Sequence, residues 1–98
     1  MLKKKFLKTK CKVEFSVPAD NVQSASVIGD FNEWDNAATP MEKVGKAFKA
    51  TLDLHLNQRY EFRYLVNGEA WLNDSSADDT VPNAFGTENA VVSTLPPQ

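Results

Sequence analysis

The chain has few of the residues on which catalytic and metal sites are usually built. Its 98 residues include one cysteine, Cys11, and one histidine, His55. A single cysteine cannot form a disulfide within the chain, so the sequence favours a reducing compartment, and we expect the cytoplasm. The sequence has no Gly-x-Ser-x-Gly motif, and no second histidine lies near a cysteine or a serine. We therefore expect no enzyme, no metal and no cofactor.

Long apolar runs are also missing. No stretch approaches the roughly 20 apolar residues of a membrane-spanning helix. The first eight residues, MLKKKFLK, are basic but are not followed by an apolar segment, so they lack the pattern of a secretory signal. We expect no membrane partner. The length of the chain suits one domain with one core.

Positive charge is scarce outside the N-terminus. Six of the eleven basic residues lie within the first 12 positions, which leaves 5 basic and 13 acidic residues in 13–98, a balance of −8. An acidic body argues against a nucleic-acid-binding domain, which would carry basic residues across a face. We divide the chain into a basic arm (1–9), one β-sandwich (10–95) and a tail (96–98). The arm is interpreted either as a solvated, frayed terminus or as a tether to an anionic partner.

What the chain does contain is a series of short segments in which apolar and polar residues alternate. The alternation is clear in residues 10–17, 47–54 and 60–66. Shorter strands are expected at residues 24–29, 41–44, 70–72 and 89–94, and Asn67-Gly68 is a strong hairpin signal. About seven short strands separated by turns predict an all-β fold, a small antiparallel β-sandwich.

Two further groups of residues are not expected to have a catalytic or metal-binding role. Cys11 lies on the apolar side of its strand, where we expect a buried, unreactive thiol, and His55 is expected at the surface. Asp74, Asp78 and Asp79 lack the Asp-x-Asp-x-Asp-Gly rhythm of a calcium loop, so they are expected to form a solvated acidic loop.

The two tryptophans lie in positions that are unusual for core residues and that suit a binding site. Trp34 follows a strand that breaks at Gly29, and it lies between Glu33 and Asp35; Trp71 also lies among polar residues. A flat aromatic ring can cover the C–H face of a sugar, while polar neighbours bond its hydroxyl groups. The competing interpretation is that each ring only covers an edge of the sandwich. The alternation in 60–66 places Arg63 on the side away from the aromatic residues of that strand, where it faces solvent.

Four motifs in order resemble the family 48 carbohydrate-binding modules. They are GDFNEW at 29–34, YEFRYLVNG at 60–68, Trp71, and GTEN at 86–89. This family includes the N-terminal early-set domains of isoamylase and of glycogen-branching enzymes, and the glycogen-binding domain of the AMP-activated protein kinase β subunit. The resemblance covers about residues 10 to 95. It implies an immunoglobulin-like, early-set sandwich that binds α-1,4-linked glucan.

The resemblance also implies a set of carbohydrate-binding residues: Trp34, Arg63, Trp71, Phe85, Thr87 and Asn89. The sequence departs from the family pattern at three of these places. Arg63 replaces a lysine, which keeps the charge and changes the hydrogen-bonding geometry. Phe85 replaces a leucine, and one extra residue, Ala70, precedes Trp71.

The sequence thus supports a non-catalytic module that binds glycogen, starch-type glucan or malto-oligosaccharide, with two tryptophans stacking on glucose units. The alternative is a protein-interaction or regulatory module that docks onto a glucan-metabolising enzyme or a kinase complex without binding sugar itself. In that case the tryptophans would anchor a protein interface. A small hydrolase is the weakest alternative, because a sandwich of this size leaves little room for an enclosing cleft.

Overall fold

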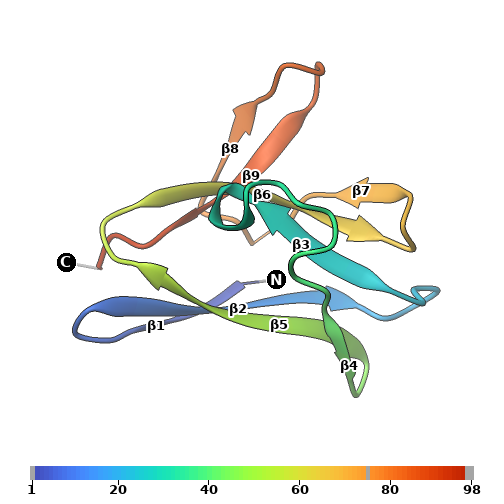
Figure 1. The fold of residues 1–98 in the computed structure, drawn as a ribbon, viewed down its shortest axis with the longest axis horizontal. Coiled ribbons are helices and arrows are strands. Elements are labelled where there is room, and N and C mark those ends of the chain that lie inside the picture. Colours follow the sequence, from blue (N-terminus) through green and yellow to red (C-terminus); the bar gives the residue numbers. More distant parts are fainter. Residues whose placement is uncertain (1, 75, 97–98) are drawn as a thin grey trace.

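Two antiparallel sheets pack face to face in the structure of the chain (Figure 1), a computed structural model that describes residues 2–74 and 76–96. The first sheet has the order β1 (Leu2–Phe6), β2 (Lys10–Pro18), β5 (Ala47–His55), β4 (Glu42–Val44). The second has the order β3 (Ala25–Gly29), β6 (Arg59–Val66), β9 (Glu88–Ser93), β8 (Asp79–Pro82), with β7 (Ala70–Leu72) also paired to β6. One short 3₁₀ helix, η1 (Asp30–Asn32), follows β3. The predicted β-sandwich is confirmed, and it is compatible with an immunoglobulin-like fold.

All seven expected strands are present, with ends within two residues of the prediction. The structure adds β8, in a segment expected to be a loop. Its sequence has one large apolar residue, Val81, so it gives no alternating pattern to recognise. The strand forms because its backbone pairs with β9, where Thr80 lies opposite Ala90. The β8–β9 hairpin projects beyond the sandwich (Figure 1).

The lysine-rich N-terminus also forms a strand. Leu2–Phe6 is β1, and it pairs along its whole length with β2, so the expectation of a frayed terminus is wrong for this segment. Lys4 lies opposite Val13 and so on the inner side of the sheet, where its ammonium group bonds Asp78 at 2.8 Å and the Ser93 carbonyl at 3.1 Å. This ion pair joins the two sheets. Met1 and residues 97–98 of the expected tail lie outside the described residues.

The core lies between the sheets and is built from the apolar sides of the alternating strands. Phe15 is its centre: the ring is fully buried and lies 5.4 Å from Phe31, 5.1 Å from Phe62 and 6.5 Å from Tyr64, measured between ring centroids. Cys11 is also fully buried, as expected, and burial raises the pKa of its thiol. Because the thiolate is the reactive form, this environment keeps the sulfur unreactive.

The expectation of a solvated acidic loop after β7 is wrong for Asp74, whereas Asp78 and Asp79 are exposed as expected. Asp74 is 3% exposed, and its carboxylate accepts a hydrogen bond of 2.6 Å from the Tyr64 hydroxyl. Burial, and then this bond, raise the pKa of Tyr64 far above its usual value. Asp78 bonds Lys4, and Asp79 pairs with Arg59 at 2.8 Å, which lowers the pKa of the Asp79 carboxyl group. Each of the three acids is thus bonded within the fold.

Candidate functional site

A change of partner along β6 creates the place where the candidate residues meet. Residues 59–62 of β6 pair with β9, and residues 64–66 pair with β7. Arg63 therefore lies at the junction, on the outer side of the sheet. Its neighbours Phe62 and Tyr64 point into the core and are at most 1% exposed. Trp71 lies opposite Leu65 and shares this outer side with Arg63.

The loop after β3 holds Trp34 in an unusual backbone conformation. Glu33 and Trp34 both have left-handed φ angles, 57° and 58°. This region is sparsely populated by residues other than glycine and costs of order 1 kcal/mol each, so it persists where neighbouring contacts enforce it. Here the Trp34 amide donates to the Gly29 carbonyl at 2.9 Å, and the indole Nε1 donates to Asp30 at 2.9 Å. The half-buried ring is thereby fixed.

Two residues brace this loop against the sheet. The second carboxylate oxygen of Asp30 accepts from the Glu61 backbone amide at 2.8 Å, which ties the loop to β6. Asn32 accepts from the Gly29 amide and donates to the Val27 carbonyl, both at 3.0 Å. Gly29 itself packs so closely on β6 that an added Cβ would lie 2.8 Å from the Cβ of Phe62.

Trp71 is held from the opposite side of the site. Its indole ring is 39% exposed, and the guanidinium carbon of Arg63 lies 5.7 Å from the ring centroid. A cation at this distance is attracted to the face of the ring. The Nε of Arg63 is buried and has no hydrogen-bond partner among the described residues. Arg63 thus orients one ring, and its guanidinium group lies beside that ring at the site.

The tip of the β8–β9 hairpin contributes the third group of side chains to the site. The side-chain oxygen of Asn83 accepts from the backbone amides of Phe85 and Thr87 at 2.9 and 3.2 Å, and its amide nitrogen donates to the Thr87 hydroxyl at 2.8 Å. These bonds close a tight turn that leaves the Phe85 ring 91% exposed. Asn83 also donates to Asn89 at 3.0 Å, and Asn89 donates to the Glu61 carboxylate at 3.1 Å.

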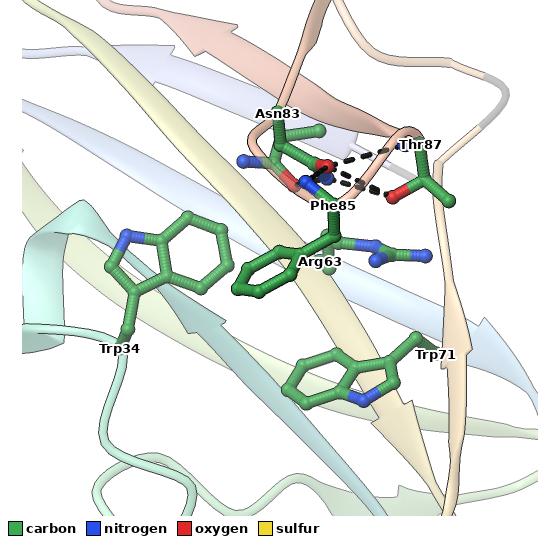
Figure 2. Close-up of a pocket in the computed structure, with 7 residues that line it drawn as sticks. Trp34, Arg63, Trp71, Asn83, Phe85 and Thr87 are labelled. Atoms are coloured by element: carbon green, nitrogen blue, oxygen red, sulfur yellow. Dashed lines mark hydrogen bonds between the residues drawn. The ribbon is translucent and has the colours of Figure 1, made fainter.

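All six predicted site residues line one cavity of about 640 Å³, together with Asn83. Figure 2 shows the indole rings of Trp34 and Trp71 turned toward one another across it, with the Phe85 ring between them in this view. Asn89 also lines the cavity, although it is only 8% exposed. The prediction missed Asn83; its signal was the Asn-Ala-Phe-Gly sequence after Pro82, which is typical of a turn closed by an asparagine side chain.

A mutation of Asp30 tests how the ring of Trp34 is held. We expect Asp30→Ala to lower the unfolding free energy by about 1–2 kcal/mol, because two hydrogen bonds to a carboxylate are lost at an exposed site. The Trp34 ring should also become more mobile. Fluorescence anisotropy of a Trp71→Phe background, in which Trp34 is the remaining indole, measures this mobility.

The matched control is Glu33→Ala. Glu33 is a carboxylate in the same loop that hydrogen-bonds to none of the residues that the structure describes, so its removal should change neither quantity. Equal effects of the two substitutions would show that Asp30 does not position the ring.

Comparisons with known proteins identify the family of the chain. Residues 5–82 match the family model of carbohydrate-binding module 48, described as the isoamylase N-terminal domain. The chain is 37% identical over 89 residues to the 1,4-alpha-glucan branching enzyme GlgB of Mycobacterium ulcerans. This alignment covers 88% of the chain and 11% of the relative. The chain is 34% identical over 79 residues to the GlgB of Rhodopirellula baltica, covering 78% of this chain and 10% of that protein. The chain thus spans about a tenth of the length of these relatives. Because the family model matches most of the length of the chain, the chain belongs to the carbohydrate-binding module 48 family.

Proposed function

We propose that this carbohydrate-binding module binds an α-1,4-linked glucan, such as glycogen or a malto-oligosaccharide, and does so without catalysis. The single observation that carries the proposal is the cavity in which Trp34, Trp71 and Arg63 meet, contributed by three separate segments of the chain. Two indole rings offer apolar faces to successive glucose units, and Phe85 adds a third ring at the tip of the hairpin. The relatives are 1,4-alpha-glucan branching enzymes, but the match covers only 11% and 10% of their length, so their activity is not part of this proposal.

The polar residues of the cavity differ in what they can offer a sugar. Arg63 lines the cavity with its guanidinium group beside Trp71 and is the best candidate to bond hydroxyl groups. Asn83 and Thr87 bond one another, and Asn89 bonds Asn83 and Glu61, so their free capacity is smaller. We assign Asn89 mainly to holding the hairpin in place and Thr87 to a hydrogen bond at the rim. This division predicts that Arg63→Gln weakens binding more than Thr87→Val.

Binding should be weak for short sugars and improve with length. The cavity is open to solvent and excludes little water, and association costs several kcal/mol of lost translational and rotational freedom, so one stacked glucose gives little net affinity. We expect maltoheptaose to bind with a dissociation constant at least about tenfold lower than that of maltose, since about 1.4 kcal/mol from a second stacked ring suffices.

Titration followed by tryptophan fluorescence measures this difference. Cellohexaose is the control, because its β-1,4 linkage gives a straight chain of the same glucose units and should not follow the two rings. No fluorescence response to maltoheptaose at millimolar concentration would contradict the proposal, as would an equal response to cellohexaose.

A further inference from the structure

The outer surface of β1 and β2 concentrates charge of one sign. The antiparallel register places alternate lysines of both strands on the side that faces away from the core, because Cys11, Val13 and Phe15 point inward. The turn between the strands adds one more. We call these five exposed residues the lysine face: Lys3, Lys5, Lys8, Lys10 and Lys12. The ion pairs among the described residues use Lys4, Lys49 and Arg59 and none of the lysine face.

Protection of the sheet edge explains only part of this pattern. Lysines on an edge strand discourage pairing with another chain, and β1 is such an edge. However, Lys10 and Lys12 lie on β2, which is paired on both sides, with β1 and with β5. Lys5 also lies directly opposite Lys12, and like charges in this position destabilise a sheet. An anionic partner that binds both lysines would offset this repulsion.

The surroundings of the lysine face restrict the kind of anion. Glu14 lies opposite Lys3, and Asp53 lies opposite Lys12, so acidic residues border the lysines on the same surface. The chain beyond residue 12 has a balance of −8. A long polyanion or a membrane plane would extend past the lysines onto this acidic body and be repelled. The outward positions of β1 and β2 hold no aromatic residue on which a nucleic-acid base could stack.

A folded protein with a compact acidic patch satisfies both restrictions. Its charged area can be limited to the lysine face, and one of its own basic residues can meet Asp53, while Glu14 already pairs with Lys49 of the module. Leu7, in the turn beside Lys8, is 42% exposed and supplies the apolar contact that protein interfaces combine with a charged rim.

We propose that the lysine face is a docking surface for a compact acidic patch on a protein partner. It lies on the outer side of the first sheet, whereas the cavity with Arg63 and Trp71 lies on the outer side of the second. The sandwich separates the two surfaces, so the module can hold a glucan and a protein at the same time. The proposal does not depend on which sugar the cavity binds.

The test is a titration of the isotope-labelled chain with tetraglutamate, an acidic peptide short enough to stay within the lysine face, followed by amide chemical shifts. We expect the largest shift changes in β1 and β2, and a dissociation constant at least about tenfold higher at ~150 mM than at ~20 mM salt. The variant Lys5→Gln/Lys10→Gln/Lys12→Gln should lose the response. The control Lys43→Gln/Lys46→Gln removes two exposed lysines near β4 and should keep it. Maltoheptaose should leave the affinity for the peptide unchanged.

Several results would overturn the proposal. One is the absence of shift changes at low salt, and another is an equal loss of binding in the control variant. A third is tighter binding to a single-stranded oligonucleotide of about 20 nucleotides, or to vesicles containing phosphatidylserine, than to the peptide. The titration of the wild-type chain, and the comparison of the peptide with the oligonucleotide and the vesicles, need no variant. The test therefore holds even if the triple substitution unfolds the chain.

Discussion

Replacing both Trp34 and Trp71 by alanine is expected to abolish measurable binding of maltoheptaose. Each ring should contribute about 1.5 kcal/mol through buried apolar area and stacking on the C–H face of a glucose unit. Loss of both, about 3 kcal/mol, raises the dissociation constant more than about 100-fold. For a weak ligand this exceeds the range that titration can reach.

The two single substitutions should have unequal effects. Trp34 is held by its bond to Asp30 and by its left-handed backbone, so its ring is preorganised and its loss costs contacts that need no ordering. Trp71 is more exposed and is oriented by Arg63. Trp71→Ala also frees the guanidinium group, which can then rotate toward a sugar hydroxyl and recover part of the loss. We expect Trp34→Ala to be the more damaging.

Isothermal titration calorimetry measures these affinities without relying on the indole signal that the mutations remove. The double variant Trp34→Phe/Trp71→Phe is the control, because it keeps flat rings at both positions and should retain most of the binding. Both tryptophans lie outside the core cluster, so circular dichroism should show folded protein in every variant. Undiminished binding in the double alanine variant would show that the sugar does not use this cavity.

The position of Arg63 shows what the sequence could predict. Strict alternation in residues 60–66 determines which side of the strand each residue occupies. In the structure, Arg63 lies on the side of β6 that faces away from the core, and its neighbours Phe62 and Tyr64 are buried, as expected. The same reasoning gave the other long strands, because a half-buried sheet requires a period of two. The motif at 29–34 placed Trp34 at the site although no periodicity applies to a loop.

The features that the sequence did not reveal depend on contacts distant along the chain. Lys4 belongs to β1 because of its register with β2 and its bond to Asp78, 74 residues away. Asp74 is buried, and it accepts hydrogen bonds from the Tyr64 hydroxyl and from the Ser76 amide. In both cases a charged residue, normally exposed, is held by a partner that only the folded chain supplies. Local pattern cannot predict such pairs.

Two phenylalanine-to-alanine substitutions should separate stability from binding. Phe15→Ala removes a fully buried ring that contacts three other aromatic rings, and such a cavity costs about 3–5 kcal/mol. Small domains have a total stability of about 5–15 kcal/mol, so we expect the melting temperature to fall by about 15 °C or more, or the chain to remain unfolded. Differential scanning calorimetry measures this change.

Phe85→Ala is the matched control, because the same atoms are removed from a ring that is 91% exposed. Its unfolding free energy should change by no more than about 0.5 kcal/mol, since no packed neighbour is lost. Affinity for maltoheptaose should nevertheless fall several-fold, because the Phe85 ring lines the cavity together with Trp34 and Trp71 and adds apolar surface for a glucose unit. A large loss of stability in Phe85→Ala would mean that the hairpin tip packs against the sandwich. Unchanged affinity in the same variant would remove Phe85 from the site and leave Trp34 and Trp71 as the stacking surface.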